Sequence, residues 1–190
     1  MFSKTNIFGV IVGVKEEFKI VNEYKVPVNI GYGKVNASNA TRELEKKVDC
    51  IVSFGFAGSV DPNLKNGQVI IPKNLITYKK KKIKLSLKYR SIIKKKLKQI
   101  CLNENDLISV DEIINTKKIK THLFNKFNVS SIDMESEAIS QTSRDLQVPC
   151  IILRVILDDT IFSIPEFIKR NTNHEGKLDY TKLFIDFMKE

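Results

Sequence analysis

The chain has 190 residues, of which 42% are hydrophobic, with 32 basic and 22 acidic side chains. A chain of this length buries roughly 70% of its unfolded surface, and its 25 Ile and 11 Phe exclude an intrinsically disordered protein. We expect residues 1–190 to form one domain. Three widely spaced cysteines without a C-x-x-C pair exclude a disulfide scaffold and predict buried thiols in a reducing compartment.

The apolar segments of the chain are short. None approaches the roughly 18–20 uncharged residues that cross a membrane. Residues 7–14 are followed by charged residues and lack the small-residue cleavage site of a leader. We therefore expect residues 7–14 to be a buried strand, and the protein to be cytoplasmic with no membrane partner.

The net charge of +10 comes from a single segment. Residues 73–98 contain eleven Lys and one Arg without any acid, and the rest of the chain has a net charge of −2. The lysine run 79–82 could bind phosphates, but Tyr78 and Tyr89 are the only aromatic residues in the segment. Lys, Ile and Asn make up 67 of the 190 residues, a composition typical of AT-rich genomes. A solvated basic edge is therefore favoured, and no nucleic-acid partner is expected.

Short apolar runs alternate with amphipathic stretches along the chain, the pattern of an α/β domain. The predicted strands are residues 7–14, 26–32, 50–54, 68–71, 107–110, 129–132 and 150–157. The predicted helices are residues 38–47, 91–102, 116–127, 134–146 and 180–188. The last strand is apolar on both faces except at Arg154, which predicts a central position in the sheet.

Residues 53–62 are rich in glycine and come directly after the third predicted strand. Gly55 and Gly58 would let backbone N–H groups approach an anion or a sugar closely. A simple turn after a strand explains the same residues. The segment alone therefore predicts either a turn or a binding loop.

Acidic residues follow the last two predicted strands. Asp133 and Glu135 lie at a strand-to-helix junction, where Asp133 could cap the helix and Glu135 could face a ligand at the carboxyl edge of the sheet. Asp158 lies where the central strand ends, and it either caps the next turn or transfers a proton. Each segment alone leaves both interpretations open.

Together these segments resemble the purine nucleoside phosphorylase superfamily. The resemblance extends to the nucleosidases that act on methylthioadenosine and S-adenosylhomocysteine, and to hopanoid-associated phosphorylase-like proteins. The motifs are collinear over most of the chain. They are GVKEE at 13–17, GYGKVNA at 31–37, the glycine-rich segment 54–69, DMES at 133–136 and RVILD at 154–158.

The resemblance implies a mixed central β-sheet flanked by helices, and cleavage of the N-glycosidic bond of an adenosine-type nucleoside. Such cleavage passes through an oxocarbenium-like sugar, so it needs a protonated leaving group, a bound ribose and a nucleophile. By motif, Asp158 would protonate the purine, and Glu135 would accept hydrogen bonds from the ribose hydroxyls beside Met134. Glu17, in preference to Glu16, would activate the attacking water.

The resemblance also implies a substrate pocket and a homodimer. Gly55 and Gly58 would line the part of the pocket that binds the sugar or phosphate. Phe56 replaces a small polar residue of the relatives, and Ile113 and Ile114 stand where an aromatic residue would stack on the base. These replacements leave the base open.

Water is the favoured acceptor, because a phosphorylase needs fixed cations and none of the five Arg lies in a glycine-rich loop. Lys34, beside Gly33, is the basic residue in such a loop and would bind phosphate in the phosphorylase alternative. His122 and His174 are 52 residues apart without nearby ligands, so no metal or cofactor is expected. A non-catalytic nucleotide- or RNA-binding module on the same fold is the contrasting function.

Overall fold

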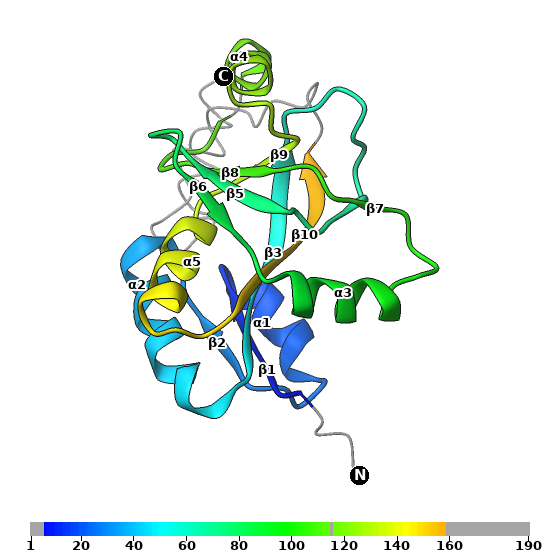
Figure 1. Cartoon of the computed structure of the whole chain (residues 1–190). Coiled ribbons are helices and arrows are strands. Elements are labelled where there is room, and N and C mark those ends of the chain that lie inside the picture. Colours follow the sequence, from blue (N-terminus) through cyan, green and yellow to red (C-terminus); the bar gives the residue numbers. More distant parts are fainter. Residues whose placement is uncertain (1–5, 115, 159–190) are drawn as a thin grey trace, which may run out of the picture.

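The computed structural model describes residues 6–114 and 116–158, which form a mixed sheet covered by helices (Figure 1). The sheet has the order β6-β5-β8-β9-β3-β10-β4-β7, with β1 pairing with β3 and with β2. Most neighbouring strands are parallel, and the pairs β3–β9, β10–β4 and β5–β6 are antiparallel. The predicted α/β fold is confirmed. The strands are β1 (Phe8–Val12), β2 (Val28–Ile30), β3 (Cys50–Ser59), β4 (Val69–Ile70), β5 (Asn74–Thr77), β6 (Lys82–Lys84), β7 (Leu102–Asn103), β8 (Leu107–Ser109), β9 (Ser131–Asp133) and β10 (Cys150–Asp158).

Helices cover both faces of the sheet. In Figure 1, α2 and α5 pack against each other on the left, where they bury Ile11 and Ile51. On the opposite face α3 places Tyr89 over Val52 and Ile151. Successive residues of a strand point to opposite faces, so neighbours in β3 contribute to separate cores. The helices of the described residues are α1 (Lys15–Asn22), α2 (Gly33–Leu44), α3 (Leu87–Lys96), α4 (Lys117–Phe127), α5 (Ser136–Asp145) and a 3-10 turn (Glu45–Lys47).

The long strand β3 determines where the ends of its neighbouring strands come together. One edge of β3 pairs with β10 along nearly its whole length. On the other edge, the parallel strand β1 reaches Ser53 and the antiparallel strand β9 pairs from Ser59 to Gly58. Since β9 runs in the opposite direction to β1, the carboxyl ends of both strands point at the middle of β3.

Two differences from the prediction lie next to this point. Residues 15–22 form helix α1, although the charged run after the first strand indicates only the end of that strand. Strand β3 continues to Ser59 rather than ending at residue 54, so Gly55 and Gly58 lie within a strand and not in a loop after it. The long pairing with β10 keeps these glycines extended.

The lysine-rich segment also differs from the prediction. It begins with the hairpin β5–β6, which the sequence did not predict, and α3 spans Leu87–Lys96 instead of 91–102. Lysines mask the apolar periodicity here, because Ile83 alone is buried in β6. Cys50 and Cys150 are buried as predicted, whereas the prediction for Cys101 is wrong, since it is exposed.

The remaining predicted elements are present with shifted ends. The second helix begins at Gly33, five residues before its predicted start, and the strand predicted at 150–157 is central, as expected. The helix predicted at 180–188 lies outside the described residues. In the described part of the chain, no helix has the length and apolar character needed to cross a membrane.

Candidate active site

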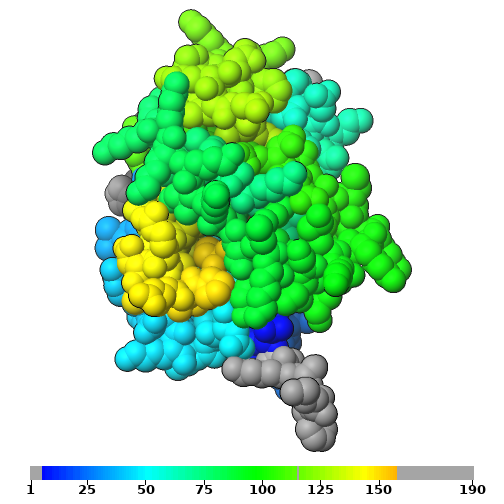
Figure 2. All heavy atoms as spheres, viewed as in Figure 1, coloured from blue at the N-terminus to red at the C-terminus, as the bar shows by residue number. Residues whose placement is uncertain are grey.

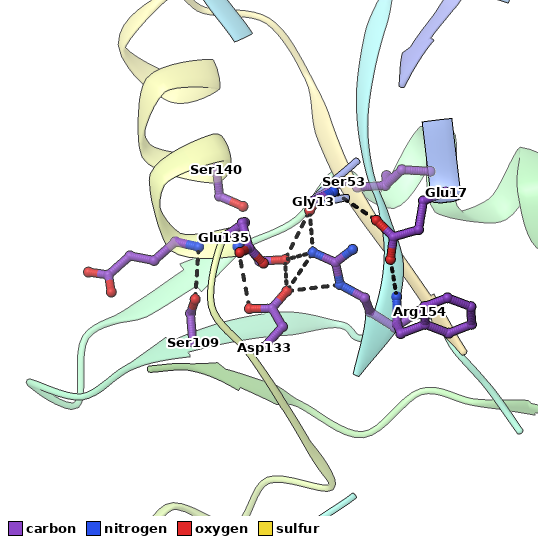
Figure 3. Close-up of polar contacts among 12 residues, drawn as sticks. Gly13, Glu17, Ser53, Ser109, Asp133, Glu135, Ser140 and Arg154 are labelled. Atoms are coloured by element: carbon purple, nitrogen blue, oxygen red, sulfur yellow. Dashed lines mark hydrogen bonds and ion pairs between the residues drawn. The ribbon is translucent and has the colours of Figure 1, made fainter. Parts of the chain in front are cut away.

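The candidate site occupies the gap on β3 between the ends of β1 and β9. Figure 3 shows the polar side chains that gather there from several elements. Gly13 follows β1 and Glu17 lies in the first turn of α1, while Asp133 ends β9 and Glu135 precedes α5. Arg154 comes from β10, where it is in register with the middle of β3.

Glu17 is buried and held by backbone donors. The residue is only 5% exposed. One carboxylate oxygen accepts hydrogen bonds from the N–H groups of Gly13 (2.8 Å) and Val14 (3.1 Å), and the other accepts from Phe56 (2.9 Å). Glu16 is exposed instead. Of the two glutamates that the sequence offered as the base, the structure places Glu17 in the site.

Gly55 makes the close approach of these groups possible. Its φ of +150° is one that other residues rarely adopt. A Cβ atom at this position would lie 2.4 Å from Oε1 of Glu17 and 2.9 Å from Nη1 of Arg154. The absence of a side chain at Gly55 thus leaves room for the carboxylate and the guanidinium. The sequence predicted a different role for Gly55, that of lining a sugar or phosphate pocket.

A buried ion pair lies beneath the site. Arg154 is 3% exposed and donates from Nε (2.9 Å) and Nη2 (2.7 Å) to one oxygen of Asp133. Its Nη2 also donates to the hydroxyls of Ser53 (2.8 Å) and Ser136 (3.0 Å). Burial disfavours the charged guanidinium, but the nearby carboxylates outweigh burial and raise the pKa of Arg154. Arg154 therefore stays charged, and the carboxylate of Asp133 balances its charge beneath the site.

Sequence reasoning missed this ion pair. The sequence offers Asp133 as a helix cap, and it does accept a hydrogen bond from the N–H of Ser136 at 3.3 Å. The available signal was Arg154, the one charged residue inside an apolar central strand. A buried charge needs a partner, and Asp133 at the end of the neighbouring predicted strand was a candidate.

Glu135 faces Glu17 across Gly13. A Cβ atom on Gly13 would lie 3.6 Å from Oε2 of Glu17 and 3.7 Å from Oε2 of Glu135. Burial is the main cause that raises the pKa of Glu135 to about 7; Asp133 raises it further, while Arg154 and the N–H of Gly33, 3.5 Å away, lower it. At neutral pH this carboxyl is therefore close to half protonated.

A pocket of about 250 Å³ opens beside Glu135. Its charged lining residues are Glu112, Asp133 and Glu135, and most of its remaining wall is apolar. Such a wall with few polar groups is typical of a site for a small organic molecule. The predicted site residues that line the pocket are Phe56, Gly58, Ile113, Ile114, Met134 and Glu135.

Lys34 and Gly33 lie at the start of α2, close to Glu135. The ammonium group of Lys34 is paired with Asp111 and with Glu137 (3.3 Å). These carboxylates compete with any anion for the lysine. Gly33 directs its N–H at Glu135.

Asp158 ends β10 and is in register with Gly58 of the pocket wall. The structure describes its backbone position, while its side chain lies outside the described part. Within the described residues, no group of three His, Cys, Asp or Glu side chains could hold a metal ion. His174 is outside that part of the chain.

Comparisons with known proteins find a matching family, related sequences and similar folds. The family model of the phosphorylase superfamily matches residues 16–179. A 5'-methylthioadenosine/S-adenosylhomocysteine nucleosidase of Maridesulfovibrio salexigens is 26% identical over 184 residues, covering 84% of this chain and 79% of that protein. The nucleosidase of that name from Neisseria meningitidis, solved with methylthio-immucillin-A, has a TM-score of 0.74 at 19% identity, over 82% of this chain and 88% of that chain. Futalosine hydrolase of Helicobacter pylori has a TM-score of 0.71 at 20% identity, over 82% and 89%.

Proposed function

Because the chain belongs to the phosphorylase superfamily, we propose that it hydrolyses the N-glycosidic bond of an adenosine-type nucleoside. The family match confirms the superfamily that the sequence motifs predicted. The observation that carries the hydrolytic assignment is the pair Glu17 and Glu135, which flank Gly13, with Glu135 also lining a largely apolar pocket. Relatives at 26–27% identity are 5'-methylthioadenosine/S-adenosylhomocysteine nucleosidases, which supports a nucleoside substrate.

Glu17 is proposed as the general base. A carboxylate has about four lone-pair positions, and three backbone N–H groups occupy three of them here. One position remains to accept a hydrogen bond from a water molecule and then its proton. The three hydrogen bonds fix the carboxylate before substrate arrives, so little reorganisation accompanies the reaction.

Glu135 is proposed to bind the ribose hydroxyls, with Met134 packing on the sugar. An ionised carboxylate accepts hydrogen bonds from both hydroxyls of a ribose. Its pKa of about 7 means that this acceptor strengthens as the pH rises through neutrality. Asp158, beside Gly58 in the strand register, is proposed to protonate the leaving base.

Water is favoured over phosphate because of the state of Lys34. A phosphorylase needs a cation available to its phosphate, and Lys34 already pairs with Asp111 and Glu137. Arg154 is engaged by Asp133 in the same way. Neither side chain is available to phosphate without losing a carboxylate partner.

Product analysis tests this function. Methylthioadenosine and adenosine are incubated with the protein in phosphate-free buffer, and the expected products are free adenine and the free pentose. Added phosphate should increase the rate little. Ribose 1-phosphate formed only with phosphate would overturn the hydrolytic assignment, and no cleavage under either condition would overturn the substrate class.

We further propose that the enzyme is a homodimer, as the resemblance implies. Phe56 and Leu157, on the pocket wall, are 42% and 61% exposed, which leaves apolar surface for a second copy to cover. Light scattering at micromolar concentration should give twice the mass of the chain. The mass of a single chain would contradict the proposal.

A further inference from the structure

A second feature, separate from the pocket, is a basic corner formed by residues 78–82 with Lys126 and Phe127. Residues 78–81 form the turn of the β5–β6 hairpin, and Lys126 and Phe127 end α4. The rings of Tyr78 and Phe127 contact each other with centroids 5.8 Å apart. Figure 2 shows the hairpin beside α4, which forms the top of the molecule. The fold thus joins two segments that are nearly 50 residues apart.

The basic corner has positive charge that is not neutralised by the described part of the chain. Lys79, Lys80, Lys81 and Lys126 are exposed, and within that part none of them forms an ion pair. Lys82 is paired with Asp106 at 3.2 Å. Helix α4 has no acidic residue, so nothing on the helix offsets Lys126.

An aromatic platform accompanies these cations. Tyr78 is 58% exposed, and the ring of Phe127 packs against its ring at an interplanar angle of 40°. Lys126 lies 5.3 Å from the centroid of Phe127. From the sequence, the AT-rich composition and the presence of only two tyrosines among the lysines favoured a solvated edge. The fold adds Phe127 to the aromatic residues beside the lysine run.

We propose that the basic corner binds single-stranded nucleic acid. Lysines around an exposed ring match the chemistry of a single strand, in which phosphates follow the cations and an unpaired base stacks on the aromatic face. A paired duplex would not offer a base to Tyr78. An anionic membrane would also contact the lysines and the ring, so vesicles are included in the test. The proposal goes beyond the nucleosidase function and does not require it.

The corner lies on the outer side of a wall of the substrate pocket. Phe124 and Phe127 of α4 pack in the same apolar cluster as Met134 and Ile114, which line the pocket. The nucleic acid would therefore bind outside the pocket, and nucleosidase turnover is not needed to detect it.

Fluorescence anisotropy with a labelled 12-nucleotide oligo(U) tests the proposal. Log Kd plotted against log salt from 50 to 200 mM should have a slope of about 3 for four phosphate contacts, since each contact on a single strand contributes about 0.7. Replacing Lys79, Lys80 and Lys81 together by Gln should weaken binding at least tenfold and lower the slope by about 2.

The matched control removes the same charge elsewhere. Lys95, Lys96 and Lys98 are exposed at the end of α3, away from the corner. Their triple Gln variant should bind within about twofold of the parent protein. Equal losses in the two triple variants would overturn the proposal, because only overall charge would then matter. Thermal melting should show both variants folded like the parent.

The ring provides a second, independent test. Tyr78→Ala should weaken oligo(U) binding about 5- to 150-fold without changing the salt slope, because stacking on one base is lost. Tyr78→Phe keeps the ring and should bind like the parent. The proposal fails if Tyr78→Ala binds normally, if the parent protein does not bind at 100 mM salt, or if phosphatidylserine vesicles bind as tightly as oligo(U).

Discussion

Glu17 and Glu135 occupy similar places in the fold but have different surroundings. Both follow a strand that ends at the middle of β3, and both lie at the start of a helix. Glu17 accepts three short backbone hydrogen bonds, whereas Glu135 has one long contact and lies beside Asp133. The comparison teaches that hydrogen-bond donors and neighbouring charges, rather than residue type, separate a proposed base from a proposed sugar ligand.

The largest effect is expected from Glu17→Gln. The amide cannot take a proton from water, and its NH₂ group would face a backbone N–H donor. Nucleoside hydrolysis should fall by about 10²–10⁴-fold, the contribution of a general base. Initial rates with methylthioadenosine measure the effect.

Glu16→Gln is the matched control for this prediction. Glu16 is next to Glu17 in the chain but exposed, so its rate should stay close to that of the parent. A Glu17→Gln protein that keeps the parent rate would show that the three hydrogen bonds serve only the structure of α1.

Loss of Asp158 tests the third carboxyl. Asp158→Asn should lower the rate by about 10²–10⁴-fold while the melting temperature stays unchanged, as expected for a general acid. Initial rates and thermal melting are measured on the same preparation. An unchanged rate would mean that Asp158 only ends β10.

Gly55→Ala should disturb the hydrogen bonds that hold Glu17 and distinguish it from Glu135. The new methyl group would lie 2.4 Å from Oε1 of Glu17, and the backbone has a φ of +150°. Strain and overpacking together should cost about 3–5 kcal/mol of unfolding free energy, measured by urea denaturation.

Gly67→Ala separates strain from the clash. Gly67 has a φ of +83°, and an added Cβ would have no other atom within 4 Å, so the cost should be about 1–2 kcal/mol from backbone strain alone. Equal losses in the two variants would mean that contact with Glu17 contributes nothing at Gly55.

The sequence predicted much of the scaffold for physical reasons that are visible in particular segments. The strand at 150–157 was predictable because it is apolar on both faces, and Glu135 because it follows a buried strand. Helix α1 was not predictable from its pattern. Its first turn is charged, and its only buried residues are Glu17 and Val21, so no apolar face stands out in the sequence. The hairpin β5–β6 was missed because lysines alternate with a single buried Ile83.

The motifs predicted most of the site residues, but not the interactions that define them. The ion pair of Arg154 and Asp133 joins residues 21 positions apart through the sheet, and the contact of Phe56 with Glu17 depends on the unusual φ of +150° at Gly55. Both depend on the register of β3 with its neighbours, which the sequence pattern does not specify.

A further expected effect concerns Glu135 and the pH dependence of stability. The pKa of Glu135 rises from an ordinary 4.5 to about 7 in the folded protein. Below pH 4.5 the carboxyl is protonated in both states. Between pH 4.5 and 7 the folded state binds more protons than the unfolded state, so stability falls as the pH rises, and the loss is complete above pH 7.

Glu135→Gln removes this pH-dependent loss. The variant should therefore gain on the order of 1–3 kcal/mol relative to the parent between about pH 4.5 and pH 8, measured by urea denaturation at both values. Glu16→Gln should show no such difference, since Glu16 is exposed. Substrate affinity should change in the opposite direction in the parent, because the ionised Glu135 binds the ribose: KM should fall as the pH rises through about 7. If the stability of Glu135→Gln relative to the parent is the same at both pH values, Glu135 ionises as readily as an exposed glutamate. The difference between Glu135 and Glu17 would then rest on their hydrogen bonds alone.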